Sequence, residues 1–552
     1  MAHGPTGISA LRNRPYEVLL AVLMLASAAL LIYYRSYLNF MLDDWAFVIY
    51  REDGGLGDLL DPHNEHISIL PVAIYKLFLS VFGMGSAMPL QILSVAVFLL
   101  SVFVLFVYLR SLVGKPAALI GCAVILFLGS AWEDLLWAFQ IGFSISIAAG
   151  IGALVMLRRQ DSFGDRIACL LLVISMISTS LGIPFAIGSG AMLLLQGENL
   201  IRRLYVVVVP VCIYGLWYLG WGHMAANALS FDNALHAPEY IARSFSLTAT
   251  EITGFSKVIS SAEVIPSLLI GLFALVAVAW GVRQRKGIPR PLLVAAAIAL
   301  AFWGLAALNL APGRGFEVSR YQFPNAVLLL MILAGAFEGA SPRARTLGVL
   351  GLIALAAIAV NIDALRNGYR DVMKPLSDKG IAGLTAVEIA RDTVDPGLAI
   401  GMNQNDTAFV AAGGYFEAEE KYGSPAWSES EIEKSSSSAR ARVDQILVAA
   451  LPVNGIPLPA GLVSGSCEVL QAGSPGSAKS IPLPAQTFTF RPRRQVFLAV
   501  GRYGDGAETG AALAEPGVET LVNVPGDSSD QPWRIGFLGS GKVRVCASVK
   551  ER

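Results

Sequence analysis

Residues 17–34 read EVLLAVLMLASAALLIYY, an apolar run of 18 residues that is long enough to cross a membrane as a helix. No small-residue cleavage site follows it, which favours a retained span over a removed signal peptide. Arg12 and Arg14 precede the run with no acidic residue between them, so the positive-inside rule keeps the N-terminus in the cytoplasm. The residues that follow the run are therefore expected outside.

The composition of the whole chain agrees with an integral membrane protein. Hydrophobic residues make up 55% of the 552 residues, charged residues make up 15%, and the mean hydropathy is +0.59. A soluble multidomain protein has fewer apolar and more charged residues. The formal net charge of zero gives no basic signature, so no nucleic-acid partner is expected.

Ten later apolar runs add to the first one, and together they predict about eleven spans. These runs lie near 88–109, 116–131, 136–157, 167–181, 183–197, 203–222, 263–282, 291–311, 323–340 and 345–365. The segment 67–82 is short and carries Pro71 and Lys76, so we expect a helix at the membrane interface there. With this segment left out, the positive-inside rule places the basic connections in the cytoplasm. The sequence thus predicts a mainly α-helical, polytopic membrane bundle.

The composition changes near residue 366, where Asp, Glu, Ser, Gly and Pro rise and apolar runs long enough to span cease. We therefore expect a transmembrane domain at residues 1–366 and an extracytoplasmic soluble domain at residues 367–552. Short β-branched and aromatic stretches between Gly and Pro turns predict a β-sandwich in the later part of the second domain. They are residues 486–490, 496–500 and 542–546.

Two of the five cysteines lie in this second domain. If the domain is outside the cytoplasm, Cys467 and Cys546 could form a disulfide that closes a long loop, worth roughly 4 kcal/mol. The alternative is two unrelated buried thiols.

Four polar clusters are expected on the outer face, and the first is Asp43-Asp44-Trp45 after the first span. Adjacent carboxylates at a membrane surface repel each other and lose hydration, which makes them candidates for function. One could act as a general base or metal ligand, and the indole of Trp45 could offer a face to a sugar ring. The structural alternative is that Asp43 caps a helix and Asp44 lies in headgroup water.

The second cluster is His63-Asn64-Glu65-His66. His63, Glu65 and His66 could bind a divalent cation, but the spacing matches neither H-E-x-x-H nor H-x-x-E-H, so no cofactor is certain. They could instead hydrogen-bond substrate or position the acids. A helix cap with two interfacial histidines is the structural alternative.

The third cluster is Glu133 and Asp134, which follow Trp132. These carboxylates could line the same cleft as Asp43 and contact substrate. Trp132 itself is more simply explained by the aromatic belt at a membrane boundary.

The fourth cluster lies between the runs 291–311 and 323–340 and contains Arg314, Arg320 and Tyr321. These arginines are expected outside, against the positive-inside bias, so they need a reason to be there. A fixed guanidinium at the mouth of a membrane cavity suits a phosphate or pyrophosphate. The alternative is an arginine that pairs with a nearby acid or reaches lipid headgroups.

An acidic pair after the first span, helices in the next outer loop, many further spans and a C-terminal extracytoplasmic domain resemble the GT-C superfamily. Its members use polyprenyl-phosphate sugars and include protein O-mannosyltransferases, aminoarabinose transferases and arabinofuranosyltransferases. The resemblance covers about residues 10–370 and implies that Asp43 or Asp44 is the base for the acceptor hydroxyl. It also implies that Arg320, helped by Arg314, holds the donor phosphate. The pair is Asp-Asp where many members have Asp and Glu, and the W-W-D-Y-G motif is absent.

The resemblance implies an inverting glycosyltransferase in a plasma membrane of the bacterial inner-membrane type, with its active site and C-terminal domain outside. Such an enzyme moves a sugar from a polyprenyl-phosphate-linked donor to a glycan, lipid or protein acceptor of the cell envelope, in contact with membrane lipids. A lipid-linked glycan transporter or flippase, and a polysaccharide polymerase or ligase, are the alternatives. A flippase should carry polar residues through the membrane interior, whereas the sequence concentrates them on the outer face.

Overall fold

The computed structural model describes residues 14–547 apart from 52–54, 226–227, 258–263, 286, 402–409, 452, 460–465, 475–477 and 508. The chain divides into two compact units. The first contains Met1–Tyr37, Asp53–Phe78 and Met88–Met373, and the second contains Leu38–Glu52, Leu79–Ala87 and Lys374–Arg552. The last division lies near the expected domain boundary, but two short N-terminal segments belong to the second unit.

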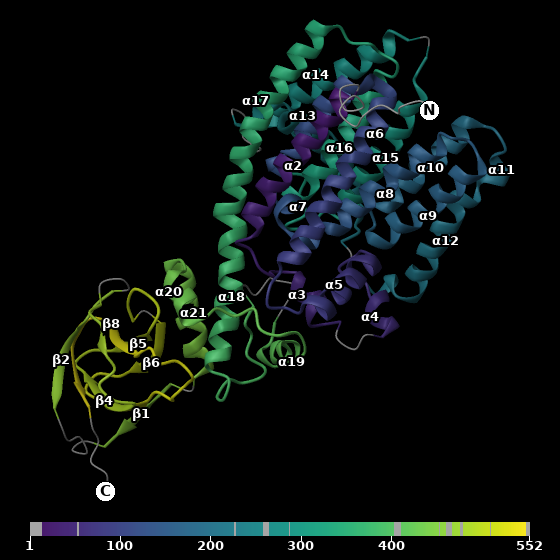
Figure 1. Ribbon diagram of the computed structural model, residues 1–552. Helices are drawn as coiled ribbons and strands as arrows, with labels where there is room; N and C mark the ends of the chain where they lie inside the picture. The colour runs from purple at the N-terminus through teal and green to yellow at the C-terminus, as the bar shows by residue number, and fades with distance from the viewer. Residues whose placement is uncertain are drawn as a thin grey trace, which may run out of the picture. The chain divides into compact units, whose positions relative to one another are not determined.

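The first unit is a bundle of helices (Figure 1). Its long helices are α2 (Pro15–Arg35), α6 (Met88–Leu126), α8 (Ile141–Leu157), α9 (Ser162–Ser178), α10 (Gly182–Gln196), α12 (Tyr205–Gly220), α13 (Phe231–Thr253), α14 (Val264–Arg283), α15 (Arg290–Leu308), α16 (Ser319–Ala336) and α17 (Ala344–Gly368). Short helices lie between them, including α4 (Leu56–Leu60), α5 (Ile69–Phe82), α7 (Trp132–Leu136) and α11 (Leu200–Arg203).

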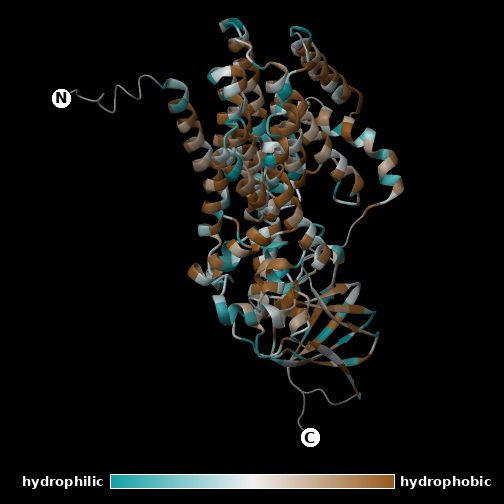
Figure 2. Cartoon of the chain, turned by 90° about the vertical axis from the view of Figure 1, so that its right-hand side faces the viewer, coloured by the Kyte–Doolittle hydropathy of each residue, from teal (hydrophilic) through white to brown (hydrophobic). Residues whose placement is uncertain are grey.

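Apolar residues dominate the long helices, as Figure 2 shows by colour. Six helical stretches of the described chain are long and apolar enough to cross a membrane. They are Pro15–Arg35, Met88–Leu126, Ala138–Leu157, Val264–Arg283, Arg290–Leu308 and Ala344–Ile389. The mainly helical class is therefore confirmed and the protein is a multi-pass membrane protein, while the count of eleven spans stays a prediction.

The helix α6 combines two of the predicted runs across a turn. Gly114 lies at this turn with φ 80°, a left-handed conformation that glycine adopts without steric cost. Next to it, the Nζ of Lys115 forms an ion pair of 2.6 Å with Glu17 of α2. The backbone N–H of Gly339 also donates to the carbonyl of Leu112 at 2.6 Å. One end of the bundle thus gathers connections that the sequence assigns to the cytoplasm.

The connection 223–263 contains a helix that the apolar pattern does not predict. This helix, α13, contacts α14, α15, α16 and α17. The Oγ of Ser230 caps its start by accepting from the N–H of Asn233 at 3.0 Å. The Nδ2 of Asn233 also donates to the carbonyl of Leu308 at 3.0 Å, which ties α13 to the end of α15. The connection is therefore part of the packed bundle.

The second unit combines short helices with two β-sheets. Its helices are α3 (Asp44–Val48), α18 (Lys374–Ile389), α19 (Ala412–Tyr422), α20 (Glu429–Lys434) and α21 (Ser437–Ala450). Its strands are β1 (Asn454–Leu458), β2 (Cys467–Ala472), β3 (Ile481–Pro482), β4 (Thr487–Pro492), β5 (Val496–Gly501), β6 (Thr509–Ala514), β7 (Glu519–Asn523), β8 (Arg534–Gly539) and β9 (Gly541–Cys546).

The sheets have the strand orders β1-β7-β4-β9-β2 and β3-β8-β5-β6, and every pair of neighbours is antiparallel. Phe490 of the first sheet and Phe537 of the second are buried, with ring centroids 5.0 Å apart. Two sheets that share a core in this way form a sandwich. The C-terminal β-rich region is thus confirmed, and the three predicted strands correspond to β4, β5 and β9.

The structure joins Cys467 and Cys546, the pair named from the sequence. The two residues face each other in the antiparallel register of β2 and β9. The bond closes a loop with a sequence separation of 79 residues. A cross-link of that length stabilises a fold by about 4 kcal/mol, mainly by restricting the unfolded chain.

Candidate functional site

Arg35 ends α2 and anchors it to α7. Its guanidinium is buried, with Nε donating to the carbonyl of Leu135 at 2.8 Å and Nη2 to that of Asp134 at 3.3 Å. The carboxylate of Asp134 is also buried, and neither of its oxygens has a hydrogen-bond partner among the described residues. Burial, and then the charge of Glu133, raise the pKa of Asp134 well above its ordinary value, which favours the neutral acid.

Glu133 caps the first turn of α16 from another element. Its Oε2 accepts from the backbone N–H of Arg320 at 2.8 Å, and its own N–H donates to the Oγ of Ser319 at 3.1 Å. The N-cap residue of α16 is Val318, whose side chain has no oxygen. Glu133 therefore supplies the acceptor that the start of the helix lacks, and it fixes the backbone position of Arg320 in the first turn.

Two partly exposed arginines lie beside glutamates at this end of the bundle. The Nη1 of Arg314 forms an ion pair of 2.8 Å with Glu65 Oε1. The Nη1 of Arg320 lies 3.9 Å from Glu133 Oε1, and its Nη2 donates to the carbonyl of Gly313 at 2.6 Å. The side chains of Arg314 and Arg320 are 23% and 29% exposed. A guanidinium with five N–H donors, held in place and still accessible, can bind an anion.

Residues 63–66 form a tight turn, so the alternative of a helix cap is wrong. The N–H of His63 donates to the carbonyl of His66 at 3.0 Å, and the reverse bond measures 2.9 Å. Asn64 has φ 51°, a left-handed conformation that asparagine tolerates. The Nε2 of His66 lies 3.6 Å from Glu65 Oε1. Burial lowers the pKa of His66, which favours the neutral imidazole.

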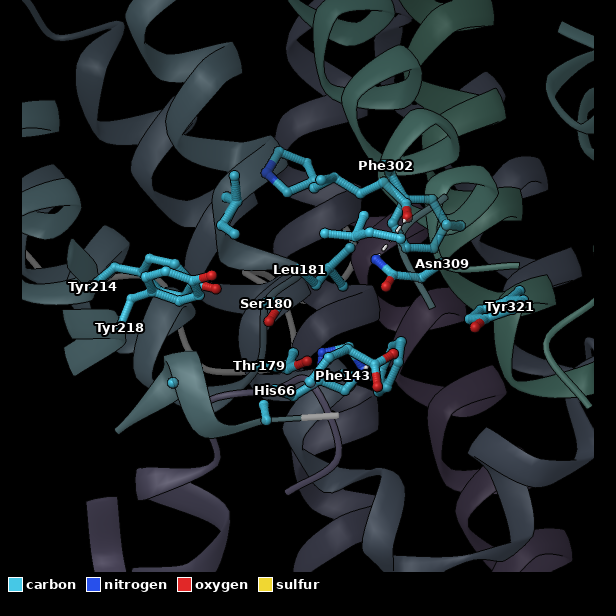
Figure 3. A pocket seen from close by; sticks show the side chains of 18 residues that line it. His66, Phe143, Thr179, Ser180, Leu181, Tyr214, Tyr218, Phe302, Asn309 and Tyr321 are labelled. Carbon is cyan, nitrogen blue, oxygen red and sulfur yellow. Dashed lines mark hydrogen bonds and ion pairs between the residues drawn. The ribbon is translucent and has the colours of Figure 1, made fainter. Parts of the chain in front are cut away.

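A cavity of about 180 Å³ opens beside this turn (Figure 3). It is enclosed by α8, the link between α9 and α10, α12 and α15, and Tyr321 of α16 closes one side. Both aromatic rings and polar side chains line it. The labelled lining residues are His66, Phe143, Thr179, Ser180, Leu181, Tyr214, Tyr218, Phe302, Asn309 and Tyr321. Of the predicted site residues, Glu65, His66 and Tyr321 meet here.

The acid pair lies in the second unit, at the start of α3. Asp44 is 2% exposed, and its Oδ2 accepts from the N–H of Met41 at 2.9 Å. Asp43 is half-buried and occupies the N-cap position, but its side chain makes no cap bond. Because this cap bond is missing, the alternative of Asp43 as a helix cap is wrong. The neighbouring Leu42 has φ 49°, which costs energy in a residue with a bulky side chain.

Trp45 packs inside the second unit. It is 4% exposed, and the rings of Phe40 and Tyr415 lie edge-on to it, each at 6.1 Å. The expectation that its indole offers a face to a sugar ring is wrong for this packing. The N–H of Asn39 also donates to the Oγ of Ser377 at 2.8 Å. The loop with the acids is thus held by α18 and α19 of the same unit.

Sequence reasoning missed Arg35, Ser319 and Asn309. Arg35 is the first charged residue after the apolar run, which is the one signal that could have found it. Among the residues that the structure describes, no group of three or more His, Cys, Asp or Glu side chains could hold a metal ion. Metal binding by His63, Glu65 and His66 stays a prediction.

The fold and the site define a multi-pass membrane protein with arginines, carboxylates and a small cavity at one end of its bundle. Two solved structures are similar in fold: the crystal structures of ArnT from Cupriavidus metallidurans, bound to undecaprenyl phosphate and in the apo state. Both are 16% identical in sequence with a TM-score of 0.44, and they cover 73% and 72% of this chain and 85% and 84% of their own. No family model and no curated protein matches the chain. A likeness of this degree assigns no function.

Proposed function

We propose that the protein is a membrane glycosyltransferase of the GT-C type, which moves a sugar from a polyprenyl-phosphate-linked donor to a glycan, lipid or protein acceptor of the cell envelope. The reaction inverts the anomeric carbon, and it takes place outside the cytoplasm. The observation that carries the proposal is the pair of arginines, Arg314 and Arg320, each held beside a glutamate at one end of an apolar bundle.

This arrangement suits an amphiphilic donor. Its polyprenyl chain stays in the bilayer while its phosphate reaches the end of the helices. The linked phosphate carries one negative charge, and it gains more as the bond to the sugar breaks. Guanidinium groups fixed in advance stabilise that added charge without reorganising during the reaction. Glu65 and Glu133 keep the two arginines oriented in the free protein.

A carboxylate of the acid pair serves as the base. Asp43 is half-buried whereas Asp44 is 2% exposed and engaged by the N–H of Met41, which supports Asp43 as the group that contacts the acceptor hydroxyl. The hydroxyl proton passes to Asp43 while the hydroxyl oxygen bonds to the anomeric carbon. The bond from that carbon to the phosphate oxygen breaks, and polyprenyl phosphate leaves.

The direct test measures binding of undecaprenyl phosphate to the protein in nanodiscs. We expect Arg320→Ala and Arg314→Ala each to weaken binding about tenfold or more, because each removes charged hydrogen bonds to the phosphate. The matched control is Arg110→Ala, which removes an arginine that lies 3.8 Å from Glu17 at the other end of the bundle. We expect the control to change the affinity less than twofold.

The base is tested by sugar transfer in the same nanodiscs. Asp43→Asn should lower kcat by about 100-fold or more, the range of general base catalysis. The proposal is contradicted if the double variant of Arg314 and Arg320 binds undecaprenyl phosphate as the unchanged protein does. The role of Asp43 is contradicted if Asp43→Asn transfers sugar at the normal rate while Asp44→Asn does not.

A further inference from the structure

The cavity beside His66 takes no part in the proposed binding of the phosphate by Arg314 and Arg320. Its volume of about 180 Å³ has room for one sugar ring, and a polyprenyl chain is far too long to fit. Tyr321, next to Arg320 in the chain, lines it, and the ring of Tyr321 lies 5.5 Å from the guanidinium carbon of Arg320. The sugar attached to a phosphate at Arg320 would therefore lie within reach of the cavity.

Four buried polar atoms on residues that line the cavity have no hydrogen-bond partner among the described residues: Glu65 Oε2, His66 Nδ1, Ser180 Oγ and Asn309 Oδ1. The Nδ2 of Asn309 donates to the carbonyl of Leu305 at 3.2 Å, so its Oδ1 points away from that carbonyl (Figure 3). The nearby carboxylate of Glu65 favours the proton of His66 on Nε2, which leaves Nδ1 as an acceptor. The atoms on Glu65, His66 and Asn309 thus require donors, whereas the Ser180 hydroxyl can both donate and accept. Sugar hydroxyl groups can do both.

The charges around the cavity are balanced without a ligand. Glu65 is the one carboxylate among the lining residues that the structure describes, and it is already paired with Arg314. None of the described residues in the lining is a lysine or an arginine. A ligand with an ammonium group would therefore find no carboxylate free of a cation, and a ligand with a carboxylate would find no cation. Burying either charge without a partner is costly.

The apolar part of the lining suits a sugar as well. Phe143, Phe302, Tyr214, Tyr218 and Tyr321 surround the cavity with aromatic rings (Figure 3). Aromatic rings pack against the C–H faces of a sugar, while the polar atoms between them bind its hydroxyls. The combination of rings and unpaired acceptors is that of a carbohydrate site.

We infer that this cavity binds the sugar ring of the donor and selects a neutral sugar, whose hydroxyls donate to Glu65, His66 and Asn309. This inference rests on the proposed function and specifies its substrate class. Aminosugars and sugar acids are excluded by the lack of an unpaired opposite charge. The selectivity belongs to the cavity, whereas the affinity for the phosphate belongs to Arg314 and Arg320.

The test compares four probes in nanodiscs at pH 7.5: undecaprenyl phosphate, and its esters with glucose, 4-amino-4-deoxyarabinose and glucuronic acid. We expect the glucose ester to bind about tenfold tighter than the other three, because it alone satisfies the acceptors without burying an unpaired charge. Asn309→Leu should remove this advantage and leave undecaprenyl phosphate binding unchanged.

A substitution that places a charge in the cavity tests the inference more directly than the removal of Asn309. Asn309→Asp adds a carboxylate of nearly the same shape, so the aminosugar ester should gain about tenfold and the glucose ester should lose. The matched control Asn523→Asp makes the same change on an exposed residue of β7 and should leave all four affinities unchanged.

The outcomes separate the two proposals. If undecaprenyl phosphate binds in a way that depends on Arg320 but the three esters bind equally, the inference about the sugar is overturned and the proposed function stands. If none of the four lipids binds, the proposed function is overturned as well. If Asn309→Asp and Asn523→Asp behave alike, the cavity does not contain the sugar.

Discussion

Glu133 shows how one side chain can serve both a helix and a site. Because it supplies the cap of α16, Glu133→Ala should lower the free energy of unfolding by about 1 kcal/mol. The same change frees the start of α16, so Arg320 should lose part of its affinity for undecaprenyl phosphate. Thermal unfolding in detergent micelles measures the first effect, and lipid binding in nanodiscs measures the second.

A compensating substitution separates these effects. Val318 already has the extended backbone of an N-cap residue, with φ −63° and ψ 133°. Val318→Ser added to Glu133→Ala should restore stability, since serine can cap the helix itself. It should not restore lipid binding, because the carboxylate beside Arg320 is still missing. If stability is not restored, Glu133 stabilises the bundle by something other than capping.

Asp134 predicts a dependence on pH. Its pKa in the folded protein is raised above 3.8, so as pH rises from 3.8 the unfolded state loses its proton first, and stability falls until the folded pKa is passed. Asp134→Asn mimics the neutral acid and removes this loss of stability at high pH. We expect it to raise the unfolding temperature at pH 7.5 and to change it little near pH 4.

The exposed Asp161 provides a control in which the pKa is shifted in the opposite direction. The side chain of Arg159, and then the N–H of Gly164, lower the pKa of Asp161, so this group stabilises the fold above its ordinary pKa and the contribution is lost as pH falls. Asp161→Asn should therefore lower the unfolding temperature at pH 7.5. If both variants raise it, the gain at Asp134 reflects only the removal of a negative charge.

Close packing between α10 and α15 depends on a single glycine. A Cβ on Gly188 would lie 2.2 Å from a side-chain carbon of Ile298, whereas a Cβ on Gly190 would meet nothing within 4 Å. Gly188→Ala should destabilise the protein by about 1–3 kcal/mol through overpacking. Gly190→Ala on the same helix should be neutral or stabilise it by up to about 1 kcal/mol. Thermal unfolding compares the two, and equal effects would contradict the packing.

The helices were predictable to the extent that their sequences carry an apolar pattern. The runs predicted from the sequence overlap α2, both halves of α6 and the later long helices. Short β-branched and aromatic stretches between Gly and Pro turns predicted three strands of the sandwich. By contrast, α13 is amphipathic, with polar residues through a length that could have been a loop. Its amphipathic period is the local signal that could have found it, but a search for continuous apolar runs passes over it.

The site was predictable in its residues but not in their partners. The sequence singled out Glu133 and Arg320, yet 187 positions separate them, and the cap between them exists only in the fold. The turn at residues 63–66 depends on a left-handed Asn64, which the spacing of two histidines does not reveal. The burial of Trp45 likewise follows from Tyr415, in a different part of the chain.

The orientation of the molecule in the membrane is a prediction from its basic connections. The positive-inside rule predicts that the second unit is outside the cytoplasm. In a protein without free cysteines (Cys122, Cys169 and Cys212 replaced by Ser), a membrane-impermeant maleimide should label Ser438→Cys in intact cells. It should label Ser162→Cys, at the exposed first residue of α9, only after lysis. The reverse pattern would contradict the orientation.

The second unit combines segments that lie far apart in the chain, so its parts are synthesised at different times. The acid loop at 38–52 leaves the ribosome early, but Tyr415, which packs on Trp45, follows about 370 residues later. At a synthesis rate of about 5–20 residues per second, this partner emerges roughly 20–70 s after the loop. During that interval the loop lacks α18 and α19, the helices that hold it. A nascent chain cut short before α18 would therefore insert its helices and still lack the contacts that order the acid loop.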